Sequence, residues 1–219
     1  MTAPVDGGGR HKREFFALPP EKRRVIINAG YRVFSRNSYK KSPVGDIAAE
    51  TGISKSLLFH YFVNKKELYL FLWEYCARAT IKCLREAGCY GQTDLFDSMR
   101  RGLAAKVQLI RIYPDMGAFV MRAYYETDSD ICDDVKRSID RYVGLRAGAK
   151  LMNLDPAQFR PGVDIQMMYQ EMYWASVGYL WDRLQRGPID PDAMERDFLR
   201  MLAHWEAIYR REDDTNASN

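Results

Sequence analysis

The sequence predicts an all-α protein with about nine helices, and three observations lead to this fold class. Apolar residues recur at spacings of three and four over several long segments of the 219-residue chain, which is the period of an amphipathic helix. Glycine or proline separates these segments, for example at Gly187-Pro188 and at Pro114. No segment shows the strict alternation of polar and apolar residues that a half-buried strand requires.

The composition is that of a globular protein with ample core. Hydrophobic residues make up 47% of the chain and charged residues 28%, which is not the balance of a disordered chain. The length suits one large domain or two modest ones. No apolar run approaches the roughly 20 residues of a membrane span, and the N-terminus lacks the apolar segment of a signal peptide. We therefore expect a cytoplasmic protein with no membrane partner.

Positive charge is concentrated in the N-terminal third. Residues 1–70 hold 13 Lys and Arg against 6 Asp and Glu, a net charge of +7. The whole chain has a net charge of +4, so the remaining residues carry −3. A basic N-terminal part on a slightly acidic body is typical of a DNA-binding head attached to a second functional part. Solvated basic faces are common, however, so charge alone does not decide the matter.

The first residues predict a flexible basic arm over residues 1–18. Three glycines precede the basic run Arg10-His11-Lys12-Arg13. Pro19-Pro20-Glu21 then begins a helix that we expect to reach about Asn37. Its apolar stripe consists of Val25, Ile26, Ala29, Val33 and Phe34.

Residues 42–62 form two short helical patterns on either side of a turn. Ser42 is a candidate N-cap of the first helix, Gly52 supplies the turn, and Ser54 is a candidate N-cap of the second. The exposed face of the second helix would carry Lys55, Ser56 and His60. A tight helix–turn–helix with a basic, hydroxyl-bearing second helix suits a DNA major groove. The alternative is an ordinary helical hairpin inside an all-α protein.

The remaining chain predicts a long connecting helix and a helical body. Asn64 and Glu67 form a capping signature at the start of a helix that extends to about Glu86. The later helices are expected to begin near Thr93 and to cover about residues 116–125, 129–152, 164–186 and 192–211. We predict a helix–turn–helix domain at 19–65, a ligand-binding and dimerisation domain at 66–211 and a polar tail at 212–219.

The last two helices are rich in large apolar residues on more than one face. One face can pack on the body, and the other needs a second partner. Two helices from a second copy would provide that partner in a four-helix interface, whereas a single deeply buried helix is the alternative. The expected interface residues are Tyr169, Val177, Leu180, Trp181, Leu184, Phe198, Met201, Leu202, Trp205 and Tyr209.

The cysteines and histidines do not suggest a metal site or a cofactor. The four cysteines form no CxxC pair, and three histidines are too few to complete a zinc set. Cys76 and Cys83 lie seven residues apart on one helical face, which favours core packing over a redox switch.

An ordered set of short runs spans about residues 20–70. It comprises Ala29-Gly30-Tyr31-Arg32-Val33-Phe34, Asp46-Ile47-Ala48, Gly52-Ile53-Ser54-Lys55, His60-Tyr61-Phe62 and Asn64-Lys65-Lys66-Glu67-Leu68. By this set the chain resembles the TetR family of bacterial transcriptional repressors. Beyond residue 70 only the order and length of the helices agree with that family.

The resemblance implies a homodimer with a ligand-sensing body and two heads that meet successive major grooves, about 34 Å apart. It implies that Lys55, Leu57, Phe59 and His60 lie on the recognition helix. It also implies that Ser42, Ser54, Tyr61 and Lys65 hold the DNA backbone. Ser56, on the same exposed face as Lys55, completes the expected DNA-binding set.

Three positions depart from the family pattern. Gly45 lies where relatives often have a longer, DNA-facing side chain, so we expect that contact to be absent. Leu57 replaces a small or hydroxylated residue and could contact a thymine methyl group. Phe59 replaces a frequent tyrosine and cannot donate a phenolic hydrogen bond. The operator sequence therefore cannot be transferred from a relative.

Large side chains on the middle helices are candidates to line an effector pocket. An aromatic and methionine-rich lining suits a bulky apolar or flat cationic molecule, whose charge Glu126 or Glu171 could balance. Large apolar side chains at such positions are more often core residues than ligand contacts. The candidates are Trp73, Cys76, Met99, Phe119, Tyr124, Tyr125, Met168, Met172 and Tyr173.

The sequence thus favours a homodimeric repressor that an effector releases from a near-palindromic, double-stranded DNA operator. A shift of the helix that begins at Asn64 would spread the two heads. The alternative is a helical dimer that acts as an interaction protein without binding DNA. No catalytic spacing or nucleotide-binding glycine motif favours an enzyme. The sequence does not decide between repression and activation.

Overall fold

The computed structural model describes residues 10–151 and 153–212, and this part of the chain is all-α, as predicted. It contains ten α-helices and two short 3₁₀ turns, η1 and η2, with no strand. None of the described helices is long and apolar enough to cross a membrane. The helices are α1 (Arg10–Ala17), α2 (Pro20–Arg36), α3 (Val44–Thr51), α4 (Lys55–Phe62), α5 (Lys65–Glu86), α6 (Leu95–Ile112), α7 (Met116–Tyr124), α8 (Cys132–Leu151), α9 (Ile165–Arg186) and α10 (Pro191–Tyr209).

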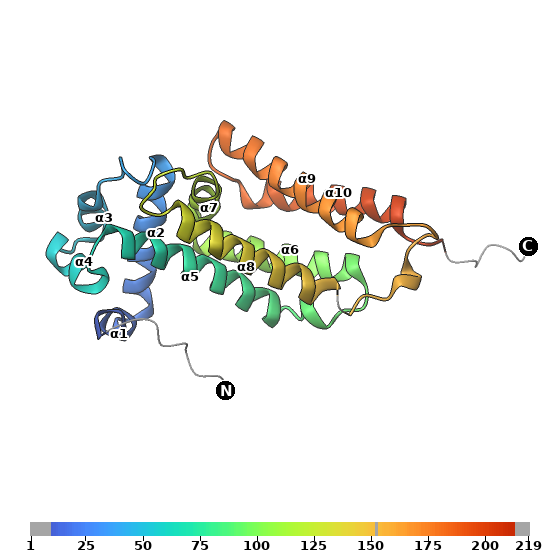
Figure 1. Cartoon of the computed structure of the whole chain (residues 1–219), viewed down its shortest axis with the longest axis horizontal. Helices are drawn as coiled ribbons and strands as arrows, with labels where there is room; N and C mark the ends of the chain where they lie inside the picture. Colours follow the sequence, from blue (N-terminus) through green and yellow to red (C-terminus); the bar gives the residue numbers. More distant parts are fainter. Residues whose placement is uncertain (1–9, 152, 213–219) are drawn as a thin grey trace, which may run out of the picture. The chain divides into compact units, whose positions relative to one another are not determined.

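The helix that the sequence did not predict is α1. It replaces the second half of the expected flexible arm (Figure 1). The other predicted helices are present, with ends that differ by a few residues. Residues 1–9 of the arm and residues 213–219 of the tail lie outside the described residues.

The chain divides into two compact units, and the division differs from the predicted domains. Unit 1 consists of Met1–Ala77 and Tyr113–Asp140, whereas unit 2 consists of Arg78–Ile112 and Arg141–Asn219. Helix α7, which was predicted to belong to the body, is therefore part of the same unit as the helix–turn–helix. The periodicity of α7 indicates that one face is buried but not which helix covers it.

Aromatic packing holds α7 in unit 1. Phe119 of α7 is fully buried, and its ring lies 5.2 Å from that of Tyr31 and 5.0 Å from that of Tyr69, measured between centroids. The Tyr31 hydroxyl donates to the carbonyl oxygen of Leu72 at 3.1 Å, which ties α2 to α5. At Gly30 an added Cβ would lie 2.6 Å from a Leu72 methyl carbon, so glycine permits this close approach. Offset and edge-to-face ring pairs stabilise such a core beyond their buried area.

The core of unit 2 combines aromatic rings with methionines. Helix α6 packs against α10, and α9 and α10 form an antiparallel pair in Figure 1. The buried side chains include Phe96 and Val107 of α6, Met168 and Met172 of α9, and Trp205 of α10. This core leaves the opposite face of α9 outside it.

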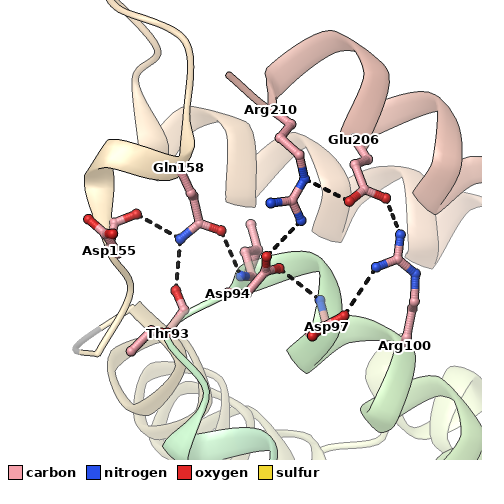
Figure 2. A network of polar contacts seen from close by, with 9 residues as sticks. Thr93, Asp94, Asp97, Arg100, Asp155, Gln158, Glu206 and Arg210 are labelled. Carbon is pink, nitrogen blue, oxygen red and sulfur yellow. Dashed lines mark hydrogen bonds and ion pairs between the residues drawn. The ribbon is translucent and has the colours of Figure 1, made fainter. Parts of the chain in front are cut away.

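A network of charged and amide groups closes one edge of unit 2 (Figure 2). Arg210 donates to Asp94 and to Glu206, each at 2.7 Å, and Arg100 joins Glu206 to Asp97. Burial alone would raise the pKa of Asp94. The backbone N–H of Asp97 and the Arg210 guanidinium outweigh that effect and lower the pKa below its usual value. The network fixes the end of α10 against the start of α6.

Candidate nucleic-acid interface

Local hydrogen bonds set the turn between α3 and α4. Gly52 has φ 68°, a left-handed conformation that ends α3. Its N–H and that of Ile53 both donate to the carbonyl oxygen of Ala48. The Ser54 hydroxyl then accepts the N–H of Leu57 at 3.0 Å and caps α4. The predicted turn and the predicted cap of the second helix are confirmed.

Helix α4 has one buried and one exposed face. Leu58 and Phe62 are buried in unit 1, whereas Lys55, Ser56, Leu57 and His60 are exposed. A polar and basic face of this kind suits the edges of bases and the phosphates of a major groove. The exposed Ser54 lies at its N-terminal end. Phe59 is half-buried, and the Lys55 ammonium lies 5.8 Å from its ring centroid.

Ser42 does not lie where the sequence suggested. It is only 2% exposed, and its hydroxyl donates to the carbonyl oxygen of Ser38 at 3.0 Å. Helix α3 starts after Pro43 without a side-chain cap. The hydroxyl therefore closes the loop after α2, and little of the Ser42 side chain is left for a contact with DNA.

Tyr61, which we expected to hold the DNA backbone, is also largely buried. Its ring packs on Phe15 of α1, with centroids 5.8 Å apart. The sequence placed it correctly on α4 but did not reveal α1, which covers it. Its main contribution is to join α1 to α4.

Lys65 has an internal contact as well as a partly exposed side chain. Its ammonium donates to the carbonyl oxygen of Lys40 at 3.1 Å and lies 4.9 Å from the centroid of the Tyr39 ring. Partial burial lowers the pKa of Lys65 from its usual value. The side chain therefore supports the loop before α3, and a phosphate contact would have to be made in addition.

Helix α1 is the element that sequence reasoning missed. Phe15 is fully buried, and its ring lies 4.9 Å from that of Phe62 and 5.2 Å from that of Phe71, between centroids. Glu14, which precedes Phe15, pairs with Nε2 of His60 on the exposed face of α4. The run Phe15-Phe16-Ala17-Leu18 after the basic residues was the available signal for a packed helix.

A strained joint connects α4 to α5. Val63 has φ 56° and ψ −54°, and the N–H of Asn64 donates to the carbonyl oxygen of Phe62. This is the γ-turn that is rare for residues other than glycine, and it costs about 1–3 kcal/mol. The Asn64 side chain accepts the N–H of Glu67 at 2.8 Å, so the predicted cap of α5 is present.

Polar contacts join the helix–turn–helix to α7. Arg32 of α2 contacts Glu50 of α3 at 2.9 Å and Asp115, just before α7, at 3.2 Å. Glu126, which follows α7, accepts the backbone N–H of Tyr39 at 2.7 Å. A displacement of α7 would therefore act on both ends of the segment from α2 to α3.

The candidate effector residues fall into both units. Trp73, Cys76 and Phe119 are buried in unit 1, where Tyr124 and Tyr125 are exposed. Met168 and Met172 are buried in unit 2, and Met99 and Tyr173 are partly buried there. The Tyr69 hydroxyl and Trp73 Nε1 are buried without a hydrogen-bond partner among the described residues. Burial, with the nearby Glu126 carboxylate, raises the pKa of Tyr69 well above its usual value.

The candidate dimer residues separate into core and surface. Leu202 and Trp205 belong to the buried core of unit 2, which leaves them little surface for an interface. Trp181 is exposed, as an interface would require. Trp174 and Met167, which were not among the predicted interface residues, are also exposed on α9. Tyr169, Val177, Leu180, Leu184, Phe198, Met201 and Tyr209 are partly buried.

No group of three or more His, Cys, Asp or Glu that could hold a metal ion occurs in residues 10–151 and 153–212. The four cysteines form no disulfide, and Cys76 and Cys89 are buried. Burial raises the pKa of the Cys83 thiol, which makes it less reactive.

The fold and the exposed face of α4 define a helix–turn–helix protein, and comparison with known proteins gives the family that this segment resembles. Residues 26–71 match the family model described as bacterial regulatory proteins, tetR family. This segment begins within α2 and ends within α5, so it contains the whole helix–turn–helix. Residues 26–71, the helix–turn–helix segment, therefore match the TetR family.

Similar proteins have been described by sequence and by structure. An HTH-type transcriptional regulator of Mycobacterium tuberculosis is 26% identical over 145 residues, which are 66% of this chain and 60% of that protein. The match thus spans less than two thirds of the relative. A TetR family transcriptional regulator from Chloroflexus aurantiacus has a TM-score of 0.60 at 21% identity, with 91% of this chain and 98% of that chain covered.

A ketosteroid transcriptional regulator of Mycobacterium tuberculosis, KstR2, has a TM-score of 0.62 at 14% identity. The match covers 89% of this chain and 97% of that one. At these identities the two solved structures support the fold alone.

Proposed function

We propose that the chain is a DNA-binding transcriptional repressor, active as a homodimer on a near-palindromic operator and released by a small effector. The exposed face of α4 carries this inference. It presents Lys55, Ser56 and His60 on a short helix whose start is fixed by the Ser54 cap and whose other face is buried. Lys55 suits a phosphate, and His60 suits the edge of a base.

The α9 surface supports a dimer. Met167, Trp174 and Trp181 are 55%, 59% and 44% exposed, and their spacing of seven residues places them on one side of α9. Met168 and Met172 face the core of unit 2 on the other side. Large aromatic side chains dominate interface energetics when a partner covers them. A second copy provides this cover with two-fold symmetry, which a near-palindromic operator would match.

We further propose that the effector is largely apolar or aromatic and carries a hydrogen-bond acceptor. The buried Trp73 and Phe119 offer apolar contacts, and Tyr69 and Trp73 offer two buried donors on successive turns of α5. Contacts of Asp115 and Glu126, which flank α7, with Arg32 and Tyr39 give the effector a route to the head. The effector must bind the released state more tightly than the DNA-bound state, because only differential affinity shifts the population.

Selection of duplexes from a random pool tests DNA binding. We expect enrichment of an inverted repeat whose half-sites are separated by about 10 base pairs or a multiple, centre to centre. Binding should weaken steeply as salt rises, because phosphate contacts release counterions. A purified dimer that binds no duplex even at low salt would favour the alternative of a helical interaction protein.

A screen of acceptor-bearing apolar compounds against the operator complex tests the effector. A compound of the proposed class should release the operator at concentrations that saturate the protein. Calorimetric binding of such compounds without any loss of operator affinity would contradict release as the mechanism.

A further inference from the structure

Helix α1 places a carboxylate beside the DNA-facing histidine. Glu14 pairs with Nε2 of His60, and both side chains are about half exposed. We propose that Glu14 is a specificity-determining residue of the interface, because it positions the His60 ring for base recognition. This inference rests on the proposed DNA-binding function.

Three contacts fix the position of Glu14. The neighbouring Phe15 is enclosed by the rings of Phe62 and Phe71. Lys12 pairs with Glu67 of α5 at 3.0 Å. Helix α1 is thus anchored to the end of α4 and the start of α5, and the backbone that carries Glu14 is held beside His60.

A third side chain secures the end of α1. Arg23 of α2 donates to the carbonyl oxygen of Phe16 at 2.6 Å. The turn between α1 and α2 has a hydrogen bond of its own, because the N–H of Leu18 donates to the carbonyl oxygen of Phe15 at 3.2 Å. These contacts order α1 and remove conformational freedom that a flexible arm would retain. A preorganised contact requires such ordering before DNA binds.

The chemistry of the pair orients the imidazole. An ionised carboxylate only accepts hydrogen bonds, so Nε2 of His60 must carry a proton to donate to Glu14. The pair thereby fixes the plane of the imidazole ring, with Nε2 bonded to Glu14. Nδ1 is the ring nitrogen that does not face the carboxylate. A histidine held in one orientation discriminates between base edges better than one that rotates, because the ordering cost is not incurred on binding.

A carboxylate near DNA also has a simple electrostatic effect. Removal of any negative charge from the head should strengthen binding to all sequences, since phosphate repulsion does not depend on the base. Positioning predicts a different result, namely a change in the order of preference among sequences. The two explanations are separated by a variant that keeps the acceptor oxygen and loses the charge.

The test measures the affinities of the full-length protein for a selected duplex and for a set of duplexes with single base-pair changes. Glu14→Ala should alter the ratio between preferred and changed base pairs by about tenfold at the positions that His60→Ala also alters, since one good base contact contributes about 1–3 kcal/mol of discrimination. Glu14→Gln should restore the wild-type order of preference. The double variant Glu14→Ala/His60→Ala should match His60→Ala alone.

Glu21→Gln on α2 is the matched control, because it removes an exposed carboxylate of the same head that pairs with Arg24. It should change all affinities by one common factor. If Glu14→Ala also changes them by one common factor, Glu14 acts as a charge and positioning is overturned. In another outcome, the wild-type protein binds the duplexes while His60→Ala and Glu14→Ala alter the preference at different base pairs. That result would overturn the positioning role of Glu14 but not DNA binding. Absence of duplex binding by the wild type overturns both.

Discussion

The two units present opposite combinations of core and surface. Unit 1 has an aromatic core around Phe119 and exposes polar and basic side chains along α4. Unit 2 closes one edge with charged groups around Arg210 and exposes two tryptophans on α9. Polar side chains can remain hydrated in the free protein and contact DNA on binding. Exposed tryptophans, by contrast, indicate a surface that another protein chain covers. On this difference rests our proposal that unit 1 recognises DNA and that unit 2 forms the dimer.

Replacement of Trp174 should have the largest effect on function. Trp174→Glu places a charge in the middle of the proposed interface, where it would lose its hydration without a partner. We expect a monomer at micromolar concentration in analytical ultracentrifugation and a loss of operator affinity of about 100-fold or more, because two linked heads bind far more tightly than one.

Ala104→Glu is the control for this change, because it adds the same charge at an exposed position of α6. It should leave the dimer intact. A Trp174→Glu variant that remains dimeric would exclude this face of α9 from the interface.

The next effect concerns the core of unit 1. Phe15→Ala should lower the free energy of unfolding by about 3 kcal/mol, because it removes a fully buried ring from an aromatic cluster. Phe16→Ala, in the next and exposed position, should cost much less. Chemical denaturation measures both. Equal and small effects would mean that α1 is the flexible arm that the sequence suggested.

The charged edge of unit 2 should give a smaller effect that depends on pH. Asp94→Asn should lower the free energy of unfolding by about 1 kcal/mol at neutral pH, since it removes a partly exposed ion pair with Arg210. The pKa of Asp94 is lowered in the folded state, so its contribution is present above the unfolded pKa of 3.8 and is lost as pH falls through the folded value. The variant should therefore lose less stability than the wild type on acidification below about pH 4.

The exposed Asp97 is the matched control for Asp94. Asp97→Asn should change stability less, because its ion pair with Arg100 is more exposed. Identical acid sensitivity of the wild type and the Asp94→Asn variant would show that the network does not stabilise unit 2 through this carboxylate.

Local signals allowed much of the helix–turn–helix to be predicted from the sequence. The turn at Gly52 and the caps at Ser54 and Asn64 depend on residues within three or four positions, so they can be predicted from the local sequence. The amphipathic periods likewise located nine of the ten described helices.

Features that depend on which helices meet were not predictable in the same way. The local sequence predicts Ser42 as an N-cap, but its hydroxyl donates to the carbonyl oxygen of Ser38 in the loop after α2. Trp205 and Trp174 are both tryptophans on amphipathic helices, yet one is in the core and the other is exposed. The spacing of apolar residues cannot distinguish these environments, since both require an apolar face. For the same reason α7 could not be assigned to unit 1 from its sequence.

The most direct test of the central claim is the salt dependence of operator binding by the wild type and by Lys55→Ala. Lys55 lies on the exposed face of α4, and Lys82 is an exposed control on the part of α5 that belongs to unit 2. If α4 enters the major groove, Lys55→Ala should weaken binding to every duplex and reduce the slope of log affinity against log salt by about one, while Lys82→Ala changes neither. Equal slopes for the wild type and both variants would contradict DNA recognition by this helix.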